Sequence, residues 1–430
     1  MKKISIIFLS FLLAFPIFIS CKPQTSVTEN TPQNTPHNTD DGATIDSDLS
    51  DANATANAKR LYNYLQDMYG KKILTGQMEN AWDDNCNMLS RVYDSVGKYP
   101  ALMGFDFMNY TSLGWNANNV QTERAIKFWN GQDWNGNTTV SGQHGIVTFC
   151  WHWRDPTWQY VSGSAGSYKP EEISFRIPYN TDSDSWNTSS TEYTAIMEDL
   201  DVIATELLKL QAAGVPVIWR PMHEGAGNLG LYKTGVAWFW WGAGNSTSYD
   251  SETSKYTVST DEDICGECYI ALWKLMYEYF TESKGLHNLI WLWNGQNKAF
   301  YPGDENVDII GDDIYAEDSD STYVNHSSRK SAYTTYSTQM GSTNKMVCLS
   351  ECGYLPHPQA CYDDSAMWSF FMIWNDGNTD SSGVTTNTAE GNFWAGEYYN
   401  SNTIKSTVYN HEYALTLDEL PDLTSYTSEE

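Results

Sequence analysis

Two short stretches of the chain end in a glutamate after a run of apolar residues, and their residue types suit chemistry. Val215 to Glu224 reads V-P-V-I-W-R-P-M-H-E, so a basic residue, a histidine and Glu224 arrive together at its end. Met346 to Gly353 reads M-V-C-L-S-E-C-G and delivers Glu351. An apolar run that ends in titratable groups is typical of a buried strand that opens at the mouth of a barrel or sheet.

Two carboxylates that converge at such a mouth can hydrolyse a glycosidic bond. One must be protonated to donate to the leaving oxygen, and the other must be ionised to attack the anomeric carbon. A separation of roughly 5–5.5 Å predicts retention through a covalent intermediate, and a wider gap predicts inversion. Asp106, Asp313 and Asp376 also end apolar runs, and we expect them to orient the pair or to bind hydroxyl groups.

Alternate residues of a strand share a face, and this rule predicts how the first stretch is oriented. Arg220 and Glu224 are expected to point to one side, and Trp219 and His223 to the other. Arg220 can keep a neighbouring carboxylate ionised through a charge-assisted hydrogen bond, and a structural ion pair is its alternative role.

Eight short apolar runs, most of them separated by helical patterns, must position these side chains. The runs lie at Ile73–Gln77, Ala101–Phe107, Ile146–Trp153, Val215–Glu224, Leu289–Asn294, Val307–Tyr315, Met346–Glu351 and Ser369–Asp376. Helical patterns lie at Ala54–Tyr69, Cys86–Val96, Thr122–Trp129, Thr191–Ala213, Cys268–Phe280 and Ser328–Met340. This order predicts an α/β fold, a (β/α)8 TIM barrel forming a single catalytic domain. A doubly wound sheet is the alternative, but the Gly-rich phosphate turn that it requires is missing from the sequence.

Glu224 then ends strand four and Glu351 ends strand seven, so the two side chains are expected to meet across the mouth. Two long inserts, Ser162–Asn187 and Gly225–Gly266, follow strands three and four and should lie around that mouth.

The net charge and the aromatic content indicate which class of molecule the protein binds. A formal net charge of −29 argues against nucleic acid and other polyanions, which need basic patches. The 18 Trp and 28 Tyr often fall in polar segments such as Trp151 to Trp158, which suits sugar rings with apolar faces and polar edges. We therefore expect a neutral polysaccharide as substrate, with Trp158 among the residues that bind it, although some of these aromatic residues must be core.

The first 51 residues are predicted to direct export and anchoring of the protein and not to be part of its folded domain. Residues 1–20 have the basic start and apolar segment of a signal peptide, and Cys21 follows in the manner of a bacterial lipoprotein site. Residues 21–51 would then be the lipidated Cys and a disordered tether, and residues 52–430 the catalytic domain. We expect an exported cell-envelope lipoprotein, at the surface or in the periplasm, or a secreted protein if Cys21 is not lipidated.

Seven cysteines remain after Cys21, so at least one thiol is unpaired within the chain. Cys265 and Cys268 have the spacing of a metal or redox pair, but no second pair follows, which leaves a local disulfide or two buried thiols. No metal and no organic cofactor is expected, because the hydrolysis needs only carboxylates and water.

The stretch W-R-P-M-H-E, followed by F-W-W-G at Phe239 to Gly242, resembles glycoside hydrolase family 26, whose members are mostly β-mannanases of a retaining (β/α)8 clan. Further matches are L-T-G-Q at Leu74–Gln77, W-H at Trp151–His152, D-D-I-Y at Asp312–Tyr315, S-E at Ser350–Glu351 and I-W-N-D at Ile373–Asp376. His223 stands before the acid/base where related families usually have Asn. The chain departs from the pattern at Gly225 to Trp238, which separates the W-W-G segment from Glu224 and leaves the fit of the aglycone side open.

The resemblance implies a role for each matched residue. Glu224 is the acid/base, Glu351 is the nucleophile, and Tyr315 hydrogen-bonds the nucleophile. The charge of Glu351 must then raise the pKa of Glu224 until a glycosyl-enzyme forms. By the same resemblance, the wall and floor of the sugar site around the scissile bond are formed by His152, His223 and Trp374, and Trp241 is an aromatic platform beside it. Asp313, which the resemblance does not assign, is expected to bind substrate from its position at a strand end. A core histidine at position 152 and simple barrel packing at Tyr315 and Trp374 are the alternatives.

The implied function is that of a monomeric retaining β-1,4-mannan hydrolase, a mannan endo-1,4-β-mannosidase acting on mannan, galactomannan or glucomannan. The same mechanism on another neutral β-glucan or β-xylan is the nearest alternative. A carbohydrate-binding lipoprotein without catalysis is the alternative from a different class.

Overall fold

The computed structural model describes residues 45–46, 48–81, 86–114, 120–140, 142–159, 166–229, 235–315, 326–340, 344–377 and 392–428. The predicted signal peptide, Cys21 and most of the predicted tether therefore lie outside the described residues. Across the described ranges, every helix is too short or too polar to cross a membrane.

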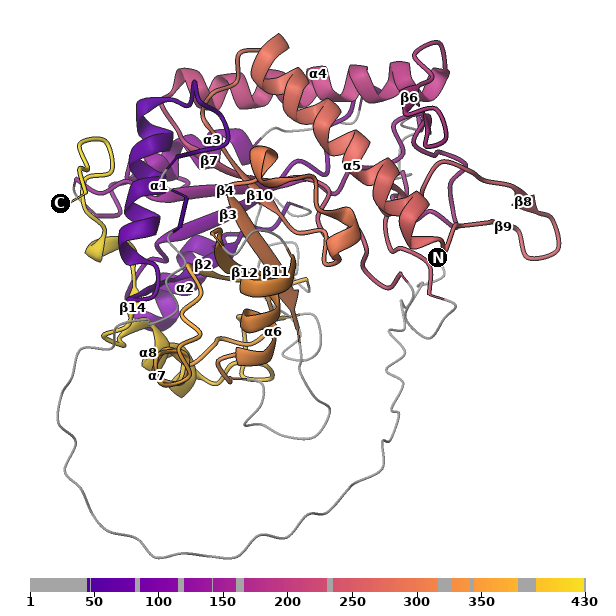
Figure 1. The fold of residues 1–430 in the computed structure, drawn as a ribbon. Coiled ribbons are helices and arrows are strands. Elements are labelled where there is room, and N and C mark those ends of the chain that lie inside the picture. The colour runs from indigo at the N-terminus through magenta and orange to yellow at the C-terminus, as the bar shows by residue number, and fades with distance from the viewer. Residues whose placement is uncertain are drawn as a thin grey trace, which may run out of the picture.

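Eight parallel strands close into a barrel at the centre of the molecule (Figure 1). In order around the barrel they are β2 (Gly76–Met78), β3 (Leu102–Asp106), β4 (Ile146–Cys150), β7 (Val217–Arg220), β10 (Leu289–Trp293), β11 (Ile309–Ile314), β12 (Met346–Cys352) and β13 (Phe371–Ile373). Most are buried along their whole length, because helices or loops cover the outer face. The predicted (β/α)8 barrel is confirmed.

The first predicted strand is divided in two. β1 (Ile73–Leu74) pairs with β14 (Ala414–Leu415) outside the barrel, and only β2 enters it. Thr75 separates them, and both its backbone N–H and its hydroxyl donate to the carbonyl oxygen of Leu415, at 3.0 and 2.8 Å. The apolar run alone did not indicate this change of partner.

The first six helices follow the predicted order with altered ends, whereas the last two were not predicted. The helices are α1 (Ala56–Met68), α2 (Met88–Val96), α3 (Val120–Trp129), α4 (Thr191–Ala212), α5 (Glu262–Glu278), α6 (Lys330–Thr335), α7 (Pro358–Asp363) and α8 (Asn402–Tyr409). Single turns are η2 (Trp240–Gly242), η3 (Tyr279–Ser283), η4 (Lys298–Phe300), η5 (Asp304–Asn306), η6 (Tyr336–Met340) and η7 (Leu417–Glu419). α5 begins earlier than predicted because the side chain of Asp261 caps it, accepting from the backbone N–H groups of Asp263 and Ile264.

The two long inserts contain the hairpins β5–β6 (Tyr179–Asn180, Ser185–Trp186) and β8–β9 (Tyr249–Asp250, Lys255–Tyr256). The inserts pack against each other, since the buried Arg176 of the first donates to the backbone oxygen of Thr257 in the second at 3.0 Å. Figure 1 shows the β8–β9 hairpin projecting well beyond the barrel.

The end of the predicted tether is part of the folded domain, so its boundary at residue 51 is wrong. The Ser50 N–H donates to Asp308 at 2.6 Å, and Asp51 contacts His287 Nδ1 at 2.8 Å. Asp308 and His287 precede β11 and β10, which places this contact at the N-terminal face of the barrel, opposite the mouth. The polar residues Ser50 and Asp51 bind here because Asp308 and His287 offer them hydrogen-bond partners. The composition of the tether does not indicate these partners.

All seven described cysteines are buried free thiols. Of the two alternatives for Cys265 and Cys268, the structure contains the buried thiols and no local disulfide. Burial raises the pKa of Cys265 to about 11 and that of Cys268 to about 12, so neither is a ready thiolate.

Candidate active site

The carboxyl ends of β7, β11 and β12 bring three carboxyl groups together. Oxygen atoms of Glu224, Asp313 and Glu351 all lie within 4.8 Å of one another. Glu351 belongs to β12 and is paired in register with Asp313 of β11, whereas Glu224 follows the end of β7. This separation suits direct attack by one carboxylate better than insertion of a water molecule between the pair.

Glu224 does not continue the strand, so the predicted alternation of faces beyond Arg220 is wrong. β7 ends at Arg220, and Met222 and Glu224 both have a φ of 50°, in the left-handed region. Such a backbone costs about 1–3 kcal/mol in a residue other than glycine and persists where the surroundings impose it. Here the Glu224 N–H donates to the carbonyl oxygen of Asn294 at 2.7 Å.

Arg220 is the cation at the centre of the site. Its side chain is 4% exposed, and it donates from Nη2 to Glu351 at 2.5 Å and from Nη1 to Asp313 at 3.0 Å. Both contacts are charge-assisted hydrogen bonds from one planar guanidinium. The carboxylate oxygens are close enough to share a metal cation, but Arg220 already supplies positive charge to two of the three groups.

The prediction that Asp313 binds substrate is wrong. Its side chain has no exposed surface, and its second oxygen accepts hydrogen bonds from Asn294 Nδ2 and Ser350 Oγ, both at 2.7 Å. Both oxygens of Asp313 are therefore occupied by the protein, and the residue orients Arg220 and Asn294.

Tyr315 holds the other oxygen of Glu351. The phenol donates to Oε2 at 2.5 Å, while Arg220 occupies Oε1. Burial and the charge of Glu351 raise the pKa of Tyr315, so the hydroxyl keeps its proton at neutral pH. Each oxygen of Glu351 thus receives one hydrogen bond, and the two together fix the orientation of the carboxylate.

The environment of Glu224 favours its protonated form. Burial raises its pKa well above the ordinary range, and the negative charges of Asp313 and Glu351 raise it further, whereas Arg220 opposes them. Arg220 pairs with Glu351 and Asp313 and, among the described contacts, not with Glu224. The site therefore combines a buried glutamate whose pKa is raised with a second glutamate, Glu351, that is hydrogen-bonded to a guanidinium.

A chain of two histidines ends on a buried aspartate beside the carboxylates. His152 Nδ1 contacts Asp106 Oδ2 at 2.5 Å, and His152 Nε2 faces His223 Nε2 at 3.2 Å. Asp106 Oδ1 accepts from the backbone N–H groups of Met108 and His152. An ionised Asp106 only accepts, so it requires the proton of His152 on Nδ1.

This requirement extends to the second histidine. With a neutral His152, its Nε2 would present a lone pair, and His223 would then donate from its own Nε2 across the 3.2 Å contact. Burial and the neighbouring His152 lower the pKa of His223, which keeps the ring neutral. His223 Nδ1 is buried without a partner among the described residues, in agreement with a nitrogen that carries no proton.

The aromatic residues around the histidines differ in their access to solvent. Trp374 lies edge-on to His152 with ring centroids 5.7 Å apart, and it is partly exposed. Trp241 is fully buried, stacks on Phe239 at 4.4 Å and donates from Nε1 to the backbone oxygen of His223. The prediction of an exposed sugar platform at Trp241 is therefore wrong, because its face and its N–H are both used to support His223.

The W-W-G segment reaches this position although Gly225 to Trp238 intervene. The chain returns so closely that a Cβ atom on Gly242 would lie 1.8 Å from the backbone oxygen of Gly225. Only glycine fits at this approach.

Two further predicted residues lie away from the carboxylates. The partly exposed ring of Trp158 lies over Gly166 in the loop after β4, and its contact with substrate stays a prediction. Asp376 is fully buried and pairs with Arg91 at 2.8 Å, so it orients the chain after β13 rather than the carboxylate pair.

Three residues of the site were missed at the sequence level. Asn294 holds the backbone of Glu224 and donates to Asp313, and Phe239 and Tyr168 pack near His152 with ring centroids 5.8 and 5.7 Å away. Asn294 ends an apolar run in the same way as the predicted aspartates, so a signal for it was present. Tyr168 lies in an insert without any pattern that indicates its position.

Comparisons with known proteins agree on one family. The family model described as glycosyl hydrolase family 26 matches residues 50–419. A mannan endo-1,4-beta-mannosidase from Thermothelomyces thermophilus is 31% identical over 87% of this chain and 64% of its own length. Two further curated relatives, both mannan endo-1,4-beta-mannosidases, come from Piromyces. The chain spans only 50–64% of the length of these three relatives.

Solved structures give the same result. A Podospora anserina GH26-CBM35 β-(1,4)-mannanase is 30% identical, with a TM-score of 0.68, over 91% of this chain and 72% of that one. A β-mannanase from a symbiotic protist of the termite Reticulitermes speratus, crystallised with a gluco-manno-oligosaccharide, is 27% identical with a TM-score of 0.63, over 88% of this chain and 98% of that one.

We predict that Glu351→Gln lowers the pKa of Glu224. The substitution removes one of the three negative charges, those of Asp313, Glu351 and Asp312, that raise this pKa, while it retains the shape of the side chain. Titration of ¹³C-labelled glutamate carboxyl groups by NMR measures the change directly. Asp201→Asn, which removes an exposed charge from α4, is the control and should leave the pKa of Glu224 in place. An unchanged pKa in Glu351→Gln would contradict the electrostatic coupling.

Proposed function

The chain belongs to glycosyl hydrolase family 26, and we propose that it is a retaining β-1,4-mannan hydrolase that cleaves mannan, galactomannan or glucomannan by double displacement. The observation that carries the proposal is the pair of glutamates with carboxyl oxygens within 4.8 Å, of which Glu351 accepts hydrogen bonds from Arg220 and Tyr315 and Glu224 is buried with a raised pKa. The curated relatives from Thermothelomyces thermophilus and Piromyces are named mannan endo-1,4-beta-mannosidases, and these names support mannan as the substrate.

Glu351 begins the first step by attack of a carboxylate oxygen on the anomeric carbon. The bond to the leaving oxygen breaks, and Glu224 gives its proton to that oxygen. Arg220 and Tyr315 hold the two oxygens of Glu351, so the nucleophile is already oriented before substrate arrives. The product of this step is a covalent glycosyl-enzyme and a shortened polysaccharide chain.

The second step reverses the roles. Esterified Glu351 carries no charge, so one of the causes of the raised pKa of Glu224 is gone and Glu224 can act as a base. It takes a proton from water, the oxygen of that water attacks the anomeric carbon, and Glu351 leaves as a carboxylate. Two displacements at one carbon restore the original configuration.

The histidines and Trp374 contact the sugar whose bond is broken. Asp106 acts through His152 and is a positioning residue, because it determines which nitrogen of each histidine carries a proton. Trp241 and Phe239 hold His223 from behind.

Reducing-sugar release from linear mannan, galactomannan, glucomannan, β-glucan and xylan tests the proposal. We expect activity on the mannans, and we expect Glu351→Ala to abolish it because the covalent intermediate cannot form. Activity only on β-glucan or xylan would retain the mechanism and replace the substrate. Binding without hydrolysis of any polymer would indicate a carbohydrate-binding protein instead.

The stereochemical course is tested in the same experiment with Glu224→Ala. On a substrate with an activated aryl leaving group, this variant should still form the glycosyl-enzyme, and added azide should then restore turnover. The expected product is the β-glycosyl azide, and an α-azide would exclude retention.

We predict that Asp106→Asn lowers kcat by about 10- to 100-fold, equivalent to the roughly 1–3 kcal/mol of an unpaired buried polar group. The amide would donate to His152 Nδ1, so both rings would change tautomer and His223 Nδ1–H would be left buried without an acceptor. Measurement of kcat, together with ¹⁵N shifts of the two rings, tests both parts.

The matched control is Asp312→Asn, because Asp312 also lies at the mouth end of a strand but is bonded to Tyr336 rather than to a histidine. We expect a smaller loss of kcat and unchanged tautomers in this variant. Equal losses in both variants, with no tautomer change at position 152, would remove the positioning role from Asp106.

We propose that the domain is exported and anchored to the cell envelope by a lipid on Cys21, and that it acts as a monomer. Residues 48–51 are docked at the N-terminal face of the barrel, which supports an anchor on the side opposite the mouth. Light scattering measures the molar mass of the protein in solution, and we expect the mass of a single chain.

For the anchor, the prediction is that Cys21→Ser moves the protein from the membrane fraction to the soluble exported fraction without loss of mannanase activity. Palmitate labelling of wild type and variant identifies the lipid. A wild-type protein that is already soluble and unlabelled would show ordinary secretion.

A further inference from the structure

A group of four aromatic side chains lies next to the nucleophile and has no role in the steps above. They are Tyr354, which follows β12, and Phe393, Tyr398 and Tyr399, which follow β13. We call these four residues the tyrosine surface. It is continuous with the site through Tyr315, whose ring centroid is 5.3 Å from that of Phe393.

The rings of the tyrosine surface form an unbroken series of contacts leading outward. Phe393 contacts Tyr399 at 4.6 Å, and Tyr399 contacts Tyr354 at 5.2 Å and Tyr398 at 4.8 Å. Exposure increases along the series, from partly exposed Phe393 to Tyr398, which is 61% exposed. Burial therefore does not explain why large aromatic side chains occupy the outer positions.

The backbone under these rings is held by two buried polar side chains. Asp376 accepts from the Trp394 N–H at 2.8 Å, and it is itself paired with Arg91. Asn400, which is 1% exposed, donates to the backbone oxygens of Gly353 and Phe393 at 2.9 and 2.8 Å. The rings are thus presented from a rigid support, which lowers the entropy that a ligand must remove on binding.

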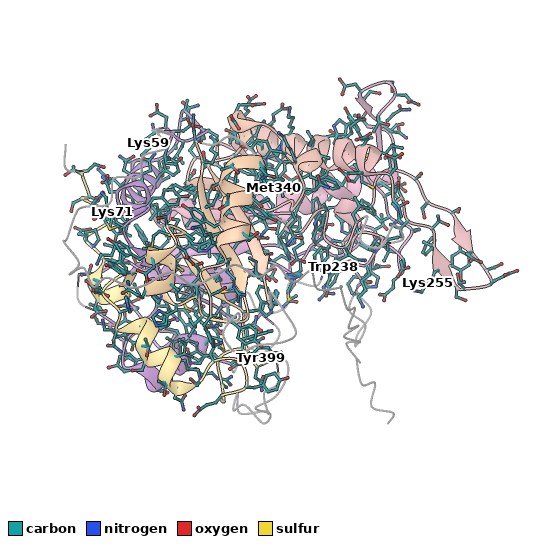
Figure 2. All side chains as sticks on the ribbon, turned by 60° about the horizontal axis from the view of Figure 1, so that its bottom comes forward. Lys59, Lys71, Trp238, Lys255, Met340 and Tyr399 are labelled. Atoms are coloured by element: carbon teal, nitrogen blue, oxygen red, sulfur yellow. The ribbon has the colours of Figure 1, made fainter. Side chains whose placement is uncertain are left out.

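Glycine permits the contact between the surface and the catalytic tyrosine. A Cβ atom on Gly353 would lie 2.9 Å from Phe393 and 3.3 Å from Tyr315. The close approach of these two rings therefore depends on Gly353, directly after β12. In Figure 2, Tyr399 lies well apart from Trp238 and Lys255, which belong to the insert after β7. The tyrosine surface is therefore separate from the outer parts of that insert.

We propose that the tyrosine surface binds further sugar rings of the same polysaccharide chain that occupies the active site. Tyrosine offers an apolar face to the C–H groups of a sugar and a hydroxyl to its polar edge. The occupant is a neutral polysaccharide because the surface continues from Tyr315 and Glu351, where the chain is cut. This inference rests on the proposed function and adds a binding region to it.

The test compares kcat and KM of the wild type and Tyr398→Ala on β-1,4-mannooligosaccharides of two to six units. We expect KM of the hexasaccharide to rise at least about fivefold, which corresponds to about 1 kcal/mol. The effect should decline as the chain shortens, and Tyr398→Phe should restore most of the binding. Tyr249→Ala, which removes an equally exposed tyrosine from the β8–β9 hairpin, is the matched control and should retain wild-type values.

Hexasaccharide binding to Glu351→Ala and to the double variant Glu351→Ala/Tyr398→Ala, measured by calorimetry, gives a second readout that is independent of turnover. Weaker binding by the double variant is expected. A Tyr398→Ala enzyme with unchanged KM at every chain length, or one that resembles Tyr249→Ala, would overturn the proposal. Failure of the wild type to hydrolyse any mannooligosaccharide would instead overturn the proposed function, so the two failures are distinguishable.

Discussion

The ion pairs of Arg220 are the interaction on which the site depends. A buried guanidinium holds Glu351 and Asp313, and Glu224 lies within 4.8 Å of both without sharing that cation. Three carboxyl groups in a site from which water is largely excluded cannot all be ionised at low cost. The one arginine is paired with Glu351 and Asp313, whereas burial raises the pKa of Glu224, which has no ion pair with Arg220.

The barrel positions Arg220, and one strained turn positions Glu224 next to it. β7 delivers Arg220 to the mouth as a regular strand, and the left-handed backbone at Met222 and Glu224 then brings the acid back toward β12. Asn294, at the end of the next strand, holds that turn through the backbone of Glu224. The strain is thus located at the residue whose placement matters most for proton transfer.

The surroundings of the pair are arranged in two parts with different physical character. On one side, Asp106, His152 and His223 are connected by successive hydrogen bonds. On the other, Tyr315 connects Glu351 to a rigid series of aromatic rings that reaches the surface. The first part controls hydrogen-bond direction at the reacting sugar, and the second offers apolar area for the sugars beyond it.

The sequence alone determined the barrel, the order of its strands and the two glutamates, because apolar runs that end in charge are local patterns. It did not determine that the side chains of Asp313 and Trp241 are buried, that residues 48–51 dock at the barrel base, or that Tyr354 and Tyr399 meet. Each of these depends on which residues distant in the chain become neighbours. Only the tertiary structure decides burial and hydrogen-bond partners, and with them whether a polar or aromatic side chain faces a substrate or supports one that does.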